Sequence, residues 1–163
     1  MKDPRELFVH ELGDILYAER KLVKTLPKLA QEATDSKLTS ALEKHLAETE
    51  QHVTNVEAAF EAIGEKPKAE KCPGIDGITK EHDEFVASEK PSGDVLDMFL
   101  TGAAARTEHY EIAAYSGLIT LADGLGENKA ATLLRKNLEQ ERAALDAVSS
   151  IAETLATASP VSA

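Results

Sequence analysis

The chain has 163 residues, of which 42% are apolar and 29% charged, a composition typical of one globular domain. Its 29 acidic side chains outnumber 18 Lys and Arg, and the net charge of −11 argues against nucleic acid or an anionic membrane as a partner. The single Cys72 excludes a disulfide within the chain, and the charged N-terminus and short apolar runs predict a cytoplasmic protein without a membrane span.

The first half of the chain predicts two long helices. Pro4 suits the first turn of a helix, and apolar residues then recur at helical spacing to about residue 33. Pro27 lies inside this segment and predicts a kink. Asp35 is a typical N-cap for the second helix, and Gly64 is placed to end that helix in a left-handed conformation.

The second half predicts a loop, a short helix and two more long helices. Glycine, proline and scattered charges over 64–76 favour a loop, and a short amphipathic helix follows at about 78–88. Helical periodicity then covers about 93–122 and about 127–157, leaving a flexible tail at 158–163. The whole sequence, 1–163, is therefore expected to form one all-α domain.

Short turns within each half and one long connection between them describe an antiparallel four-helix bundle with one crossover. The two helical hairpins also match each other when the sequence is shifted by 92 residues. This register pairs Glu19 with Glu111 and Leu42 with Leu134 without a gap. It predicts a pseudo-twofold bundle with one glutamate from each half at a symmetric core position.

Acidic side chains from all four long helices fall on apolar faces, where helical geometry turns them inward. A single inward glutamate is more typical of a pair with lysine, a dimer contact or the edge of a core, and a single histidine of a structural role. The tyrosines Tyr17, Tyr110 and Tyr115 are likewise more typical of packing. The inward set comprises Glu19, Glu48, Glu108, Glu111 and Glu141, with His45 and His52 on the same edge of the second helix as Glu48.

Inward acids on all four long helices together are harder to explain without cations. Five ionised glutamates carry −5 in one core, and no comparable set of lysines or arginines lies in the same stripes. Such a cluster would cost several kcal/mol per unpaired ion, and two divalent ions would supply +4. Oxygen ligands with one or two imidazoles suit iron or manganese, and Cys72 stands outside the set, so a structural zinc site is not indicated.

Four stretches of the sequence resemble the YciF/YciE-type bacterial stress-response family of ferritin-like proteins: 11–20, 45–53, 108–115 and 138–144. The resemblance implies a ferritin-like, rubrerythrin-like bundle that is usually dimeric and holds two metal ions. Two departures are notable. Glu48 and His52 are four residues apart where the family spacing is three, and Leu145 stands where relatives commonly offer a polar group. Carried over by position, the implied metal ligands are Glu19, Glu48, His52, Glu108, Glu111 and Glu141.

Three functions follow as hypotheses. The first is a dinuclear iron protein, with manganese as the other metal, that acts on dioxygen or peroxide as an oxidoreductase, with Tyr17 or Tyr115 as an electron donor. The second is a metal-independent helical homodimer that acts as an interaction or stress-adaptor module. The third, a subunit of an iron-storage cage, is the weakest because no fifth helix is expected after residue 157.

Overall fold

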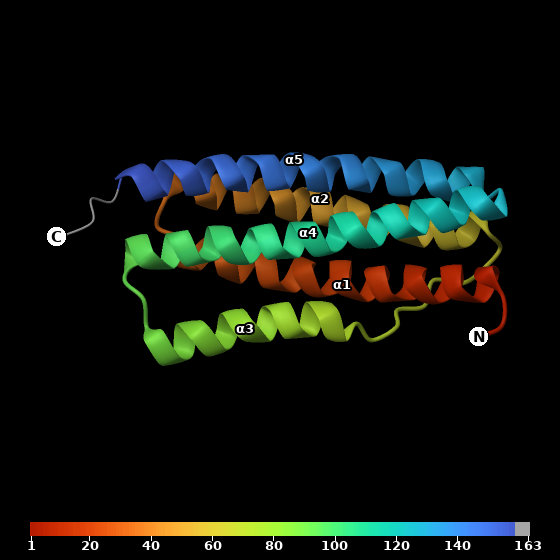
Figure 1. The fold of residues 1–163 in the computed structure, drawn as a ribbon, viewed down its shortest axis with the longest axis horizontal. Helices are drawn as coiled ribbons and strands as arrows, with labels where there is room; N and C mark the ends of the chain where they lie inside the picture. The colour runs from red at the N-terminus through yellow and green to blue at the C-terminus, as the bar shows by residue number, and fades with distance from the viewer. Residues whose placement is uncertain (159–163) are drawn as a thin grey trace.

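The computed structural model describes residues 1–158, which form five helices connected by short segments (Figure 1). No helix in this part of the chain is long and apolar enough to cross a bilayer. The helices are α1 (Pro4–Glu32), α2 (Ser36–Ala62), α3 (Pro73–Glu89), α4 (Gly93–Leu125) and α5 (Asn128–Ala158).

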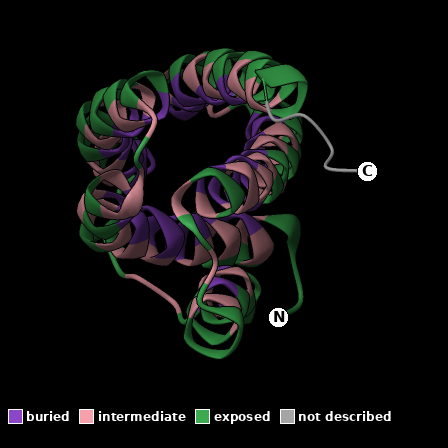
Figure 2. Ribbon diagram, turned by 90° about the vertical axis from the view of Figure 1, so that its left-hand side faces the viewer, coloured by how far each residue is buried: buried purple, intermediate pink, exposed green. Residues whose placement is uncertain are grey.

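The four long helices form a ferritin-like bundle of two antiparallel hairpins. α1 packs on α2 and α4 packs on α5, while α2 meets α5 and α1 meets α4 across the bundle. Figure 2, viewed along the bundle, shows the buried residues of these helices facing a common interior and α3 lying outside the ring. The predicted all-α bundle with one long crossover and an extra helix is confirmed.

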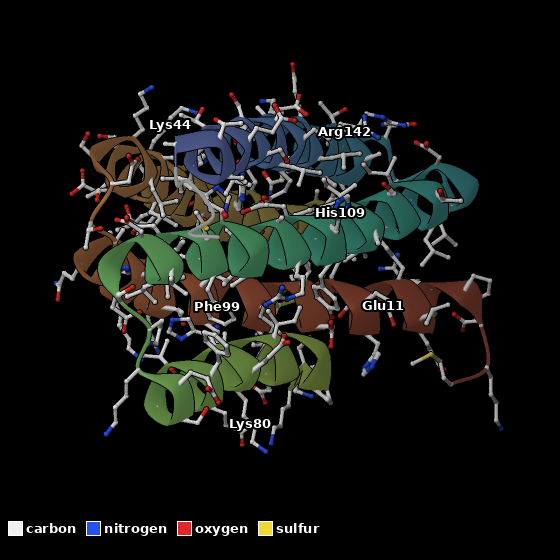
Figure 3. The ribbon with its side chains drawn as sticks, turned by 60° about the vertical axis from the view of Figure 1, so that its left-hand side comes forward. Glu11, Lys44, Lys80, Phe99, His109 and Arg142 are labelled. Carbon is white, nitrogen blue, oxygen red and sulfur yellow. The ribbon has the colours of Figure 1, made fainter. Side chains whose placement is uncertain are left out.

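Helix α3 packs on the outside of the bundle through an aromatic contact and an ion pair. The rings of Phe85 on α3 and Phe99 on α4 stack with centroids 3.9 Å apart, and Phe99 reaches from α4 toward α3 in Figure 3. On the α1 side, Asp76 of α3 pairs with Lys21 and accepts a hydrogen bond from the Tyr17 hydroxyl. The crossover is thereby fixed to both hairpins.

The helix boundaries differ from the sequence-based expectation at three places. α3 begins at Pro73 instead of near 78, because Cys72 acts as its N-cap and accepts from the Ile75 amide at 3.5 Å. α4 continues to Leu125, where Gly126 ends it with a φ of 74°. α5 continues through Ala158, so the predicted tail begins one residue too early, and 159–163 lie outside the described residues.

The turn between α1 and α2 is fastened to α4 by a buried carboxylate. Asp97 accepts hydrogen bonds from the Thr34 amide at 2.8 Å, the Thr34 hydroxyl at 2.5 Å and the Asp35 amide at 2.9 Å. Asp35 in turn caps α2 by accepting from the Leu38 amide. One side chain of the α4–α5 hairpin therefore fixes the turn of the α1–α2 hairpin.

Candidate metal centre

Carboxylates and imidazoles from all four long helices converge inside the bundle. The side chains form two groups that share Glu141, and within each group one potential ligand atom per residue lies within 4.8 Å of the others. All six residues are at least nine-tenths buried. The first group is His45, Glu108, Glu111 and Glu141; the second is Glu19, His52 and Glu141.

Glu141 lies between the two groups and directs one oxygen toward each histidine. Its Oε1 atom is 2.9 Å from His52 Nδ1, and its Oε2 atom is 3.7 Å from His45 Nε2. Glu19 Oε1 is 3.4 Å from the same His52 nitrogen, and Glu108 Oε1 is 3.3 Å from the same His45 nitrogen. A carboxylate placed in this way is suited to bridge two cations.

The ring of His52 is oriented so that Nδ1 faces the acids. Gln140 Oε1 lies 3.0 Å from His52 Nε2, and an amide oxygen only accepts, so Nε2 carries a hydrogen. In the neutral ring the lone pair is then on Nδ1, which points at Glu19 and Glu141. A partner that fixes the other ring nitrogen is characteristic of histidines that bind metals.

Tyr115 and Asn137 support the site from one side. The Tyr115 hydroxyl donates to Glu19 Oε1 and accepts from the Asn137 amide at 2.9 Å. Asn137 also donates to the backbone carbonyl of His52 at 3.3 Å and accepts from Asn55 at 2.7 Å. These bonds hold the Glu19 side chain and the His52 backbone in place.

The unsatisfied polar atoms of the interior are confined to this cluster. Within residues 1–158, the buried side-chain nitrogen and oxygen atoms without a hydrogen-bond partner all belong to the same six residues. His52 Nδ1 and Glu141 Oε1 are close but not aligned for a hydrogen bond. Buried polar groups are normally satisfied, so this concentration requires a ligand or proton that pairs with them. Glu19, Glu108, Glu111 and Glu141 carry −4 when ionised, which two divalent ions balance.

The pKa values of the metal-free cluster also indicate that its negative charges lack partners. Burial, reinforced by the neighbouring Glu141 charge, raises the pKa of Glu108 and Glu111 well above the usual range. Burial also raises the pKa of Glu19. Burial disfavours the His52 cation, but Glu141 and Glu19 outweigh it and raise the pKa of His52 to about 10. The same His52 pairing outweighs burial at Glu141 and lowers its pKa.

Five of the six residues predicted as ligands lie in the two groups, and Glu48 does not. The Glu48 side chain is partly exposed and pairs with Lys44 at 2.7 Å. Its second oxygen lies 3.9 Å from His45 Nδ1, and the His45 ring together with Lys44 lowers the pKa of Glu48 to about 2. Glu48 thus lies near the His45 nitrogen that faces away from Glu108 and Glu141, at a distance too long for a hydrogen bond.

His45, for which the sequence predicts a structural role, belongs to the first group. The 92-residue register contained the signal for this arrangement. It pairs the central Glu141 with Thr49 and not with Glu48, and Thr49 is fully buried, bonding the His45 carbonyl at 2.8 Å. The α2 face that points inward therefore carries residues 45, 49 and 52. Thr49, three residues before His52, takes the place of the family glutamate, and Glu48, four residues before His52, lies beside that face.

Comparison with known proteins agrees with the fold and the sequence motifs. Residues 3–159 match the domain of unknown function DUF892. The chain belongs to this family. It is 39% identical to protein YciF of Escherichia coli (strain K12) over 144 residues, which are 88% of this chain and 86% of that protein. The predicted resemblance to the YciF-type family is confirmed.

Two solved structures show how closely the DUF892 chain follows its relatives. The crystal structure of the E. coli stress protein YciF superimposes with a TM-score of 0.91 at 36% identity, covering 96% of this chain and 99% of that one. YcfI from Rhodopseudomonas palustris, described as a candidate structural protein, gives a TM-score of 0.88 at 38% identity, covering 91% and 94%. The bundle is thus shared along nearly the whole DUF892 chain.

Proposed function

We propose that this chain is a dinuclear metal protein, with iron as the favoured metal and manganese as the alternative, that reacts with dioxygen or peroxide during stress. The observation that carries the proposal is the confinement of unsatisfied buried atoms to two groups joined by Glu141. Oxygen and imidazole ligands without a thiolate favour iron or manganese over structural zinc. The description of E. coli YciF as a stress protein supports the physiological setting.

The residues have separable roles in this proposal. Glu19 and His52 would hold one ion and His45, Glu108 and Glu111 the other, and Glu141, which belongs to both groups, would serve both ions. His52 would have to give up its Nδ1 proton to act as a ligand, because metal-binding imidazoles are neutral. Two iron ions, when bound, supply the two electrons needed to reduce one peroxide to water.

Tyr115 is better placed than Tyr17 to exchange a proton or an electron with the centre. Its hydroxyl contacts Glu19, and its ring lies edge-on to His52 with centroids 6.2 Å apart. The Tyr17 hydroxyl instead bonds Asp76 on α3. Burial raises the pKa of Tyr115 well above its usual value, so the hydroxyl stays protonated and donates to Glu19.

Metal analysis tests the proposal directly. Protein purified from cells grown with iron should contain close to two ions per chain, and Glu19→Ala or Glu111→Ala should lose most of one or both. His45→Ala should lose more metal than Glu48→Ala, because only His45 lies within ligand distance of the first group. The exposed Glu139→Ala is the matched control and should keep the wild-type content.

A wild-type protein with less than one ion per chain, or unchanged content in both glutamate variants, would contradict the proposal. A metal-independent interaction module is then the second candidate. The observation in its favour is that protonated His52 partly neutralises Glu19 and Glu141 without any metal. The description of YcfI as a candidate structural protein points the same way.

A further inference from the structure

A narrow pocket enters the bundle between α2, α4 and α5 and ends at the candidate metal centre. Its volume is about 60 Å³. The buried His45 and Glu108 lie at its inner end, and the exposed Lys44 lies at its outer end, paired with Glu48. Figure 3 shows Lys44 on the outer side of the bundle, where α2 and α5 run side by side. The pocket therefore connects the surface to the first group of ligands.

Alanines form much of the pocket wall, and one of them has a particular position in the bundle. Ala144 follows Glu141 by three residues, and di-iron bundles carry Glu-x-x-His motifs at this spacing. The 92-residue register pairs Ala144 with His52, so α2 has an imidazole where α5 has a methyl group. The missing ring leaves open space beside Glu108. The pocket is thus a consequence of this asymmetry between the hairpins.

The size and lining of the pocket restrict what it can hold. Pockets for drug-sized ligands enclose about 300–1,000 Å³, whereas 60 Å³ admits only a few water-sized molecules. The walls are apolar, including Leu38, Leu42 and Val148, and they carry no charge between the mouth and the floor. At the floor, Glu108 Oε2 and His45 Nδ1 have no hydrogen-bond partner. A small, weakly polar molecule with hydrogen-bonding atoms matches this lining.

We infer that the pocket admits an oxidant of two oxygen atoms, dioxygen or hydrogen peroxide, and delivers it to the His45 side of the centre. This inference rests on the proposed dinuclear metal function. The pocket excludes organic hydroperoxides by size, because a branched or aromatic group does not fit between Ala41, Ala104 and Ala144. The ion pair of Lys44 and Glu48 marks the entrance.

Filling the pocket from its wall tests the inference. Ala144→Leu adds a branched side chain inside the pocket, and Ala143→Leu adds the same group on the exposed face of α5, outside the pocket lining. Ala104→Val narrows the opposite wall and serves as the second variant if Ala144→Leu folds poorly. Thermal melts and metal analysis establish that each variant folds and keeps two ions.

Two measurements test whether the pocket is open and whether oxidants use it. In crystals of metal-free protein under xenon pressure, xenon should occupy the pocket in wild type and Ala143→Leu and be absent from Ala144→Leu, since apolar cavities bind xenon. In iron-loaded protein, stopped-flow oxidation of Fe(II) by hydrogen peroxide and by dissolved dioxygen should slow at least tenfold in Ala144→Leu and remain unchanged in Ala143→Leu. Cumene hydroperoxide should react at least tenfold more slowly than hydrogen peroxide with the wild type.

The outcomes separate this inference from the function on which it rests. If Ala144→Leu keeps two ions and reacts with both oxidants at the wild-type rate, the pocket is not the route and the inference is overturned while the metal function stands. If cumene hydroperoxide reacts as fast as hydrogen peroxide, the size restriction is overturned. A wild type without metal overturns both, and metal analysis identifies that case before any kinetics. If Ala144→Leu slows Fe(II) oxidation with only one of the two oxidants, that oxidant is the one that uses the pocket.

Discussion

Both oxygens of Glu111 and both oxygens of Glu141 are buried without a hydrogen-bond partner, but only Glu141 has histidine nitrogens within 4 Å. The Glu111 carboxylate is fully buried, and burial followed by the Glu141 charge raises its pKa well above the usual range. Because folding raises this pKa, the folded metal-free protein holds a proton at Glu111 more tightly than the unfolded chain does, and ionising Glu111 reduces stability. Metal binding requires the opposite, an ionised Glu111.

Glu111→Gln should therefore separate stability from metal binding. The amide keeps the shape of the acid but has no charged form, so folding at pH 7 no longer has to protonate this group or bury its charge. The chelated variant should therefore be about 1–3 kcal/mol more stable than wild type at pH 7. Its metal affinity should fall. Denaturant melts with a chelator and a metal titration measure the two effects.

The exposed Glu139→Gln is the control for this experiment and should change the unfolding free energy by less than about 0.5 kcal/mol. If Glu111→Gln melts lower than wild type at pH 7, the carboxylate is stabilised in a way that its surroundings do not show. The argument from crowded acids would then lose its basis.

At the scale of the helices, one residue of register decides which side chain enters the site. Consecutive residues of an α-helix are rotated by about 100°, so Glu48 and Thr49 face different neighbours although both lie on α2. Thr49 is buried beside the centre, and Glu48 reaches the surface. Helix ends matter in the same way, because the α1–α2 turn sets how the two helices are aligned.

Asp97 should be important for that alignment. Asp97→Ala removes three hydrogen bonds to residues 34 and 35 and leaves the partly buried Thr34 and Asp35 amides without this partner. We expect a loss of about 2–4 kcal/mol in the free energy of unfolding. Asp94→Ala, an exposed change in the first turn of the same helix, should cost about 0.5 kcal/mol or less. Urea melts of both variants measure the difference, and equal losses would contradict the fastening role of Asp97.

At the scale of the whole molecule, the buried cluster predicts an unusual dependence of stability on pH. For Glu19, Glu108 and Glu111 the pKa is raised on folding, so their contribution is present at low pH and is lost as pH rises above about 4.3. For His52 the pKa rises to about 10, so its contribution is lost between about 6.5 and 10. Glu48, with a pKa of about 2, contributes stability that is lost below about 4.3.

The metal-free protein should therefore be most stable at mildly acidic pH and become steadily less stable toward pH 9. Saturating metal should reverse this trend near neutral pH, because it binds only the folded state. Melting temperatures from pH 4 to 9, with a chelator and with Fe(II) or Mn(II), give both curves. A metal-free curve that rises between pH 5 and 8 would contradict the raised pKa values.

The oligomeric state is the remaining prediction at this scale. We propose a homodimer, as the family resemblance implies, although two chains of net charge −11 repel each other. Because salt screens this repulsion, dimerisation should strengthen between about 20 and 200 mM salt. Light scattering across this range measures the mass, and a monomer at physiological salt would contradict the proposal.

Much of this protein follows from the sequence by itself. Helical periodicity, the Asp35 cap and the left-handed Gly64 and Gly126 are local features, and local features determined the four long helices. The lengths of the connections then determined the pairing into two hairpins. The inward glutamates on α1, α4 and α5 followed from the same periodicity, because the apolar stripes of these helices leave only one face for the core.

Helical periodicity leaves open how α2 is rotated against α5, and the tertiary structure decided this rotation and what lies between the two helices. A helical face is about 100° wide, so periodicity admits both residue 48 and residue 49 near its edge, and packing against the neighbouring helices selects one. That choice placed His45 beside Glu108 and Glu48 at the surface. The pocket next to Ala144 depends on the same packing, since a small side chain leaves a cavity only where no neighbour fills the space.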